Sequence, residues 1–106
     1  MARYVFQFTS TARPGEDETF NRWYDDVHMP DVLALPGFLS GQRYRVLDGT
    51  AARPRYVAAY QVETNDPQAT LTHLFEAGKA MVISPSLDQE QVTITILEPG
   101  TSKKKT

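Results

Sequence analysis

The sequence predicts an α+β fold in which four strands and two helices follow the order βαββαβ. Four segments, 4–9, 38–46, 55–63 and 91–97, have the alternating side chains or the β-branched and aromatic content of strands. Apolar residues three and four positions apart follow the first and third of these segments, as in amphipathic helices. With right-handed crossovers, this order gives an antiparallel sheet with both helices on one face, the ferredoxin-like arrangement.

The first helix is expected after the Pro14-Gly15 turn, where the acidic residues 16–18 suit the positive end of a helix dipole. Its predicted buried stripe consists of Phe20, Trp23, Tyr24 and Val27. Pro30 disfavours helical geometry at the residue before it, so we expect the helix to end or kink near His28. A short second helical piece, 30–35, then leads into a turn at Pro36-Gly37.

The second helix is expected to start at Asp66-Pro67, an N-cap residue followed by proline at the first helical position. The break at 84–86 (Ser-Pro-Ser) precedes the last strand. A hairpin loop is predicted at Asp48-Gly49 and Arg53-Pro54, between the second and third strands. The predicted buried stripe of the second helix is Leu71, Leu74, Phe75, Gly78 and Val82.

A chain of 106 residues supports a single domain, which we assign to residues 1–100, with a disordered basic tail at 101–106. The net charge of −2 is spread along the chain, so neither nucleic acid nor a membrane surface is an expected partner. The absence of cysteine excludes disulfides and thiolate chemistry. With no apolar run of about 18 residues and no signal peptide, we expect a cytoplasmic protein.

Both sides of the predicted strands carry apolar residues. Phe6 and Phe8 point to one side of the first strand and Val5 to the other, and Leu97 opposes the isoleucines of the last strand. Two helices cover only one face of the sheet, so the open face predicts association. Two such sheets packed face to face form a two-fold homodimer.

His28 is the main candidate for chemistry. At about 100° per residue it lies on the border of the first helix's apolar stripe, with Asp25 three and Tyr24 four residues before it. A carboxylate from Asp25 would fix the imidazole tautomer and leave the other nitrogen free as a general base. The helix end and Asp25 favour imidazolium, whereas burial favours the neutral ring. The alternative is a partly exposed histidine that only complements the helix dipole.

Five further residues complete the candidate site. Trp23 is a possible aromatic wall, although such residues are more often core, and Asp31 either caps the short helix or faces the cavity. Arg43 and Tyr44 lie on opposite faces of the second strand, so at most one points toward the helices. Tyr44 or Tyr60 would donate a hydrogen bond to a developing oxyanion.

No metal or cofactor is expected. His28, Asp25 and Asp31 lack a recognised metal-binding spacing, and His73 is predicted to lie opposite the buried stripe of its helix and to be exposed. There is also no glycine-rich phosphate loop and no nucleophile elbow.

The run 23–31 (WYDDVHMPD), followed by 35–38 (LPGF) and Arg43-Tyr44, resembles the EthD-like family of the dimeric α+β barrel superfamily over residues 4–97. The resemblance implies a ferredoxin-like protomer whose sheet pairs with that of a second copy to form a barrel. It also implies a pocket between helices and sheet, where histidine and tyrosine transfer protons. The superfamily includes cofactor-free isomerases, cyclases, lyases and dehydratases, quinone-forming monooxygenases and haem-degrading enzymes.

Three functions follow as hypotheses. The first is a cofactor-independent lyase, isomerase or cyclase with His28 as base, acting on a small carbonyl, phenolic or polyketide-like substrate. The second is a monooxygenase acting on haem or an aromatic polyketide. The third is a non-catalytic accessory protein that binds a small molecule.

Overall fold

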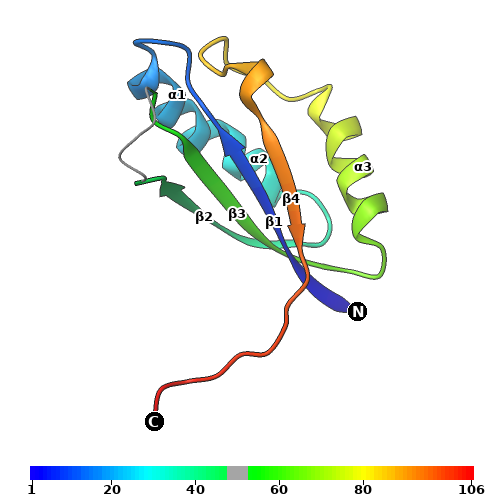
Figure 1. Cartoon of the computed structure of the whole chain (residues 1–106). Coiled ribbons are helices and arrows are strands. Elements are labelled where there is room, and N and C mark those ends of the chain that lie inside the picture. Colours follow the sequence, from blue (N-terminus) through cyan, green and yellow to red (C-terminus); the bar gives the residue numbers. More distant parts are fainter. Residues whose placement is uncertain (48–52) are drawn as a thin grey trace.

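The computed structural model describes residues 1–47 and 53–106 and has the predicted ferredoxin-like α+β fold (Figure 1). The four strands form one antiparallel sheet in the order β2-β3-β1-β4. The hairpin turn predicted at Asp48-Gly49 lies outside the described residues. The elements are β1 (Ala2–Ser10), α1 (Asp17–Trp23), the π-helical turn η1 (Tyr24–His28), α2 (Met29–Leu33), β2 (Phe38–Arg45), β3 (Tyr56–Thr64), α3 (Pro67–Gly78), the 3₁₀ turn η2 (Gln89–Gln91) and β4 (Thr93–Leu97).

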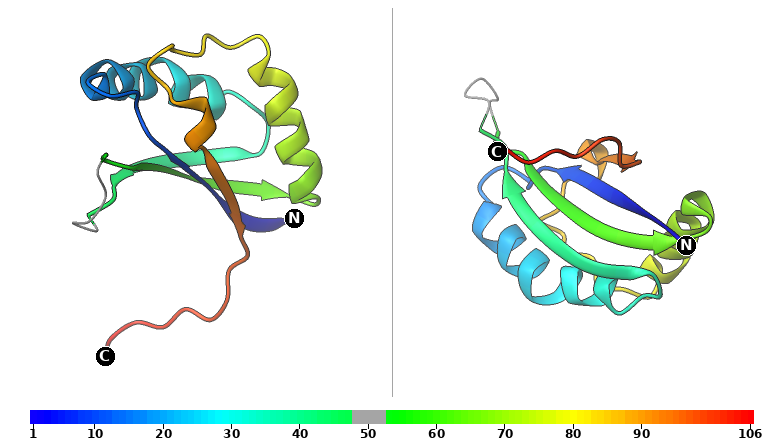
Figure 2. Two further views of the ribbon diagram at one scale, coloured as in Figure 1. Left: turned by 45° about the horizontal axis from the view of Figure 1, so that its top comes forward. Right: turned by 90° about the horizontal axis from the view of Figure 1, so that it is seen from below.

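One face of the sheet packs against the helices, all of which lie on the same side of it (Figure 2). A row of paired residues crosses all four strands on this face: Gly41, Tyr60, Phe6 and Ile96. A β-bulge in β2 between Phe38 and Ser40 shifts the alternation, so that Phe38 is buried on the helix side. Regular alternation in β2 therefore holds from Gly41 onward, which places Arg43 and Tyr44 on opposite faces as predicted, and Leu39 at the bulge is half-exposed.

Aromatic side chains fill the space between the sheet and the first helical segment. Phe6 and Phe20 are fully buried, and Phe38 meets both Phe6 and Tyr60 edge to face at ring centroid distances of 5.7 and 5.8 Å. Such edge-to-face pairs contribute about 0.5–1.5 kcal/mol each beyond area burial. This cluster holds α1, η1 and α2 against the centre of the sheet.

The first helical segment stays helical from Asp17 to Leu33 but changes geometry where Pro30 predicted an end or a kink. Over the π-helical turn, the amide of Met29 donates to the carbonyl of Tyr24, five residues earlier. The wider turn changes the phase of the helix, since π-helices have more residues per turn than α-helices. Phe20 is buried as predicted, whereas Val27 is 37% exposed and the prediction that it is core is wrong.

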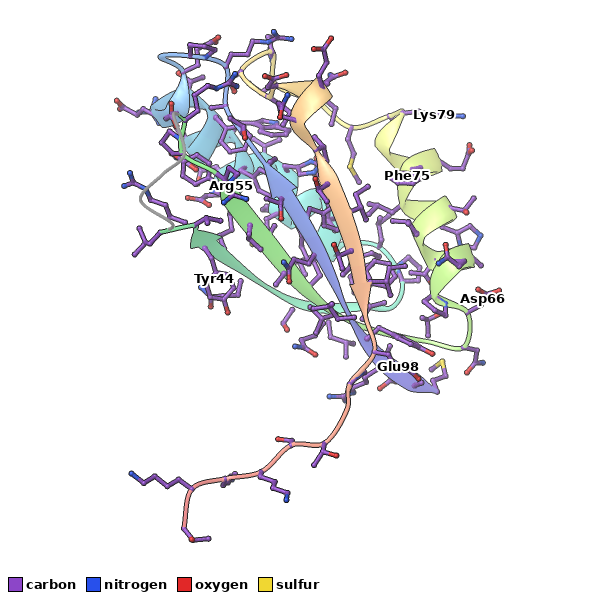
Figure 3. The ribbon with its side chains drawn as sticks, viewed as in Figure 1. Tyr44, Arg55, Asp66, Phe75, Lys79 and Glu98 are labelled. Atoms are coloured by element: carbon purple, nitrogen blue, oxygen red, sulfur yellow. The ribbon has the colours of Figure 1, made fainter. Side chains whose placement is uncertain are left out.

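The second helix begins as predicted. The Asp66 carboxylate accepts a hydrogen bond from the amide of Ala69 at 3.1 Å, and Pro67 is the first helical residue. The helix ends at Gly78, earlier than its predicted stripe required, so Val82 lies beyond it and is exposed. Leu74 is buried, but Phe75 is 51% exposed and does not belong to the closed core. Figure 3 labels Phe75 on α3.

No described helix or strand covers the other face of the sheet (Figure 2). By strand alternation it carries Val5, Val57, Ala59 and Leu97 among glutamine and threonine side chains, so it is less apolar than the sequence indicated. Residues 98–106 run away from the domain, exposed and without helix or strand (Figure 1). Among the described residues, none of the helices has the length and apolar content needed to traverse a bilayer.

Candidate functional site

A cavity of about 200 Å³ lies between the sheet and both helical segments, and His28 is in its wall. Its polar side chains are His28, Tyr24 and Tyr60; the remainder of the lining is aliphatic or aromatic, apart from Gly78. A small number of polar groups converging in an apolar cavity is typical of small-molecule sites. The remaining lining residues are Phe8, Val32, Leu74, Phe75, Gly78, Met81, Ile83, Val92 and Ile94.

Packing fixes the orientation of the His28 ring. The ring stacks on Trp23, with centroids 4.8 Å apart and planes at 23°, and meets Tyr24 edge to face at 4.9 Å. The π-helical turn aligns His28 with Trp23, because residues five apart share a face there. The indole Nε1 of Trp23 donates to the carbonyl of Val82 at 2.9 Å. Trp23 thus lies behind His28, buried and outside the cavity lining, so of the two alternatives it is a core residue and not the aromatic wall of the cavity.

His28 has the environment of a neutral imidazole. Burial lowers the pKa of His28, and the nearby Asp31 carboxylate opposes this shift. Its Nδ1 atom is buried and has no hydrogen-bond partner among the described residues. Asp31 acts on His28 only through its charge, since no hydrogen bond joins them, and it does not cap α2.

Asp25 does not orient His28, which corrects the prediction from the sequence. Its Oδ1 accepts a hydrogen bond from Nη1 of Arg43 at 2.9 Å. The helical spacing allowed Asp25 to reach either side of the helix, and the guanidinium on β2 is the stronger partner. Arg43 is accordingly the residue of the Arg43-Tyr44 pair that faces the helices, but it lies outside the cavity lining.

The two phenols of the cavity are held in their protonated form. Burial raises the pKa of Tyr24, while the Tyr60 hydroxyl and the Arg43 charge oppose this shift. Burial raises the pKa of Tyr60 well above its ordinary value, and the neighbouring Tyr24 adds to the shift. The Tyr60 hydroxyl is buried and lacks a hydrogen-bond partner among the described residues. The two phenols influence each other's pKa, and the Tyr60 hydroxyl is the one without a partner that is free to donate to a ligand.

Gly41 makes room for the Tyr60 ring. A Cβ atom at this position would lie 3.1 Å from two carbons of the Tyr60 ring and 3.2 Å from Cε of Met29. Real Cβ contacts are rarely so short. A glycine at this point of β2 thus lets α2 approach the sheet above Tyr60.

Tyr44 does not share this site. Its side chain is 55% exposed. Figure 3 shows it at the edge strand β2, pointing away from the helices. The assignment of Tyr44 to the His28 site as an oxyanion donor is therefore wrong within one protomer. Odd or even numbering tells which residues share a face only within one strand. Tyr44 and Tyr60 belong to different strands, so the pairing register of β2 with β3 decides on which face each of them lies.

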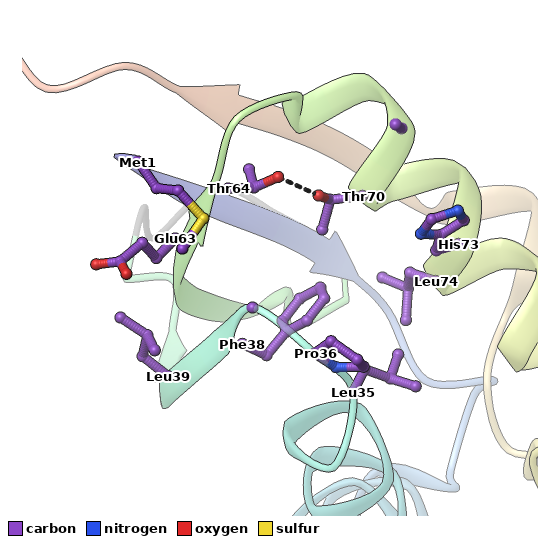
Figure 4. Close-up of a pocket in the computed structure, with 12 residues that line it drawn as sticks. Met1, Leu35, Pro36, Phe38, Leu39, Glu63, Thr64, Thr70, His73 and Leu74 are labelled. Carbon is purple, nitrogen blue, oxygen red and sulfur yellow. Dashed lines mark hydrogen bonds between the residues drawn. The ribbon is translucent and has the colours of Figure 1, made fainter.

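A larger cavity, of about 520 Å³, lies at the other end of α3 (Figure 4). The 35–38 turn and the first half of α3 line it, and Leu74 separates it from the His28 cavity. His73 is exposed, as predicted, and borders this larger cavity. Glu63, its other ionisable residue, pairs with Arg3 at 3.1 Å. The smaller cavity is the better candidate for chemistry because it brings together unpaired buried donors and acceptors.

Some residues of the site were not found from the sequence. Phe8 and Ile94 line the cavity, and strand alternation places both on the helix side. Met81 and Ile83 follow α3 in an irregular segment whose path no periodicity predicts. Within residues 1–47 and 53–106, no group of three or more histidine, aspartate or glutamate residues is arranged to hold a metal ion.

Solved structures share this fold over nearly the whole chain. An EthD family protein from Bacillus halodurans C-125 has a TM-score of 0.61 and 17% identity, covering 92% of this chain and 99% of that one. A putative antibiotic biosynthesis monooxygenase from Bordetella bronchiseptica has a TM-score of 0.69 and 13% identity, covering 95% and 100%. A dimeric ferredoxin-like protein from an uncultured marine organism has a TM-score of 0.63 and 8% identity, covering 100% and 95%.

The TM-scores establish a shared fold at low sequence identity, and they confirm at the level of the fold the resemblance to EthD-like proteins. No curated protein matches the sequence. A family model described as a domain of unknown function, DUF4286, matches residues 3–93. The chain therefore belongs to the DUF4286 family.

Proposed function

We propose that this protein is a cofactor-independent enzyme that transfers a proton within a small carbonyl or phenolic substrate bound in the His28 cavity. The observation that carries the proposal is the pair of buried, unpartnered polar atoms at this cavity, Nδ1 of His28 and Oη of Tyr60. Buried polar groups are nearly always hydrogen-bonded, so such a pair calls for a ligand that completes them.

Each residue has one role in this reaction. Neutral His28 removes a proton from the carbon next to the carbonyl, and the C–H electrons form the enolate as charge moves to oxygen. The hydroxyls of Tyr60 and Tyr24 donate to that oxyanion. The proton returns from the imidazolium to a carbon or oxygen of the substrate. General acid–base catalysis of this kind contributes about 10²–10⁴-fold.

The cavity limits the size of the substrate. An engineered apolar cavity of about 150 Å³ accommodates benzene. The His28 cavity, at about 200 Å³, thus suits one six-membered ring with small substituents. The apolar lining from β1, β4 and α3 favours a ring with its oxygen directed at His28 and the tyrosines.

Deuterium exchange tests the proposal. Wild-type protein in D₂O is incubated with cyclohexanone and phenylacetaldehyde, and loss of the α-proton signal is followed by NMR. We expect exchange faster than in buffer, reduced about 10²-fold or more in His28→Gln. His73→Gln, which removes the other histidine, should exchange like wild type.

The outcomes separate catalysis from binding. Chemical-shift changes on ligand addition without exchange would support the non-catalytic accessory protein instead. Exchange that is equally fast in His28→Gln would refute the role of His28.

The haem-dependent alternative has less support. It requires a histidine on the second helix facing the cavity, whereas His73 borders the larger cavity on the other side of Leu74. A haem titration is expected to give no shift of the Soret band. A shift that is lost in His73→Gln would favour the alternative.

We further propose that the protein is a homodimer formed through the uncovered face of the sheet. Apolar residues such as Val57 and Ala59 lie on β3, an interior strand of this face, and no described helix covers them. The dimeric ferredoxin-like protein with the same fold supports the proposal.

A further inference from the structure

The side chain of Arg43 lies in an aromatic cage just outside the cavity. Its guanidinium carbon is 4.4 Å from the ring centroid of Tyr24 and 5.7 Å from those of Phe20 and Tyr56. Only 14% of the side chain is exposed. A cation packed on an aromatic face is attracted to it, more strongly where water is excluded.

The sheet register explains how a buried arginine fits there. Arg43 on β2 belongs to a row of paired residues that crosses the sheet. The other members of the row are Ala58 on β3, Phe8 on β1 and Ile94 on β4. Phe8 and Ile94 line the cavity, whereas Arg43 does not. The small side chain of Ala58 leaves room for the guanidinium. Tyr24 lines the cavity and also carries the guanidinium on its ring, so it connects the two.

The charge of Arg43 is incompletely neutralised. One nitrogen, Nη1, is paired with Asp25, whose side chain is 59% exposed. Nε is buried without a hydrogen-bond partner among the described residues. Water screens the charge of the exposed Asp25 carboxylate more than that of the buried guanidinium. The ion pair therefore leaves a net positive potential on the side of the aromatic rings.

We propose that Arg43 is a positioning residue that acts through Tyr24: its charge behind the phenol ring strengthens the hydroxyls of Tyr24 and Tyr60 as donors to the substrate oxyanion. This inference rests on the proposed function. Because the charge stays outside the cavity, it favours negative charge on the substrate without forming an ion pair with it. The Arg43 charge also opposes the burial-induced rise in the pKa of both phenols.

A substrate-free titration tests the electrostatic part. All tyrosines are replaced by difluorotyrosine, whose greater acidity brings phenol ionisation into a pH range where the fold persists, and ¹⁹F NMR follows each residue. We expect the Tyr24 signal to titrate at higher pH in Arg43→Met and at lower pH in Asp25→Asn, with Arg43→Lys close to wild type. Arg22→Met, which breaks an exposed pair with Glu18, is the control and should leave Tyr24 unchanged.

Exchange of the cyclohexanone α-proton tests the catalytic part. Arg43→Met should lower the rate by about 10-fold with unchanged ketone affinity, less than the 10²–10³-fold typical of losing a direct donor. Arg43→Lys should keep most of the wild-type exchange rate. An unmoved Tyr24 titration in a folded Arg43→Met protein would overturn the inference whether or not the enzyme acts on the ketone. A shifted titration without any exchange in wild type would instead refute the proposed function alone.

Discussion

The ionisation of His28 is governed by the rings that pack against it. Its pKa lies below the ordinary value of about 6.5, because burial disfavours the charged ring. The unfolded chain therefore binds more protons than the folded one between these two pKa values. The His28 contribution to the free energy of unfolding is thus complete above about pH 6.5 and decreases as the pH falls toward the folded pKa.

The direction in which the free energy of unfolding changes with pH gives the first prediction. On acidification below about pH 6.5, wild type should lose stability by up to about 1.4 kcal/mol per pH unit through His28, and His28→Gln should lose less. Urea midpoints at several pH values measure the difference, with His73→Gln as the control. An identical acid dependence in wild type and His28→Gln would contradict it.

The only tryptophan of the chain reports the same event. Trp23 stacks on His28 at 4.8 Å, and a protonated imidazole quenches indole emission. Fluorescence should therefore fall on acidification with a midpoint below pH 6.5, and this step should be absent in His28→Gln. A step that persists without His28 would show that another group causes it.

The Tyr60 hydroxyl, which we propose as a donor to the substrate, is expected to lower the stability of the fold. Because this hydroxyl is buried without a partner, Tyr60→Phe should leave the free energy of unfolding equal or raise it by up to about 1 kcal/mol. The urea midpoint of Tyr60→Phe should therefore be equal to or above that of wild type. The same substitution should slow α-proton exchange about 10²-fold if the hydroxyl binds the oxyanion. Tyr56→Phe is the matched comparison, because the Tyr56 hydroxyl donates to Asp17 at 2.7 Å and its loss should destabilise by about 1 kcal/mol.

At the scale of elements, the site depends on how α3 ends. Gly78 is the last residue of α3 and lines the His28 cavity, and a Cβ atom there would meet nothing within 4 Å. Gly78→Ala should therefore be tolerated and stabilise the helix by up to about 1 kcal/mol. Gly78→Leu should fill cavity space instead.

Binding of phenol, followed by chemical-shift changes in ¹⁵N-labelled protein, measures this second effect. We expect Gly78→Leu to weaken binding about 10-fold or more, corresponding to about 1.4 kcal/mol. Ala80→Leu places the same side chain on an exposed residue nearby and should bind like wild type. Unchanged phenol affinity in Gly78→Leu would exclude this cavity as the binding site.

At the scale of the whole molecule, the uncovered face of the sheet is the surface through which we propose that two copies of the chain associate. Sedimentation should give the mass of two protomers. Ala59→Lys, which places a charge where β3 pairs with both β1 and β2, should give one protomer, because an unpaired charge at a buried interface is costly. Gln68→Lys on exposed α3 is the control. A monomeric wild type would refute the dimer.

Local patterns in the sequence determined the order of elements, the ferredoxin-like fold and the choice of His28. These patterns depend only on residues close together in the sequence, so they can be recognised without knowledge of tertiary contacts. They are the alternation of the strands, the Asp66-Pro67 start of the second helix and the apolar spacing of the first helix. The resemblance to EthD-like proteins identified the same fold.

Only the tertiary structure decided which side chains contact one another at the candidate site. Asp25 pairs with Arg43 instead of His28, because the arginine arrives from a strand that is distant in sequence. The bulge in β2 and the π-helical turn changed which side chains face inward, since one extra residue in a strand or turn reverses or rotates every later position. Sequence periodicity assumes regular elements, and at this site the two irregular elements set the geometry.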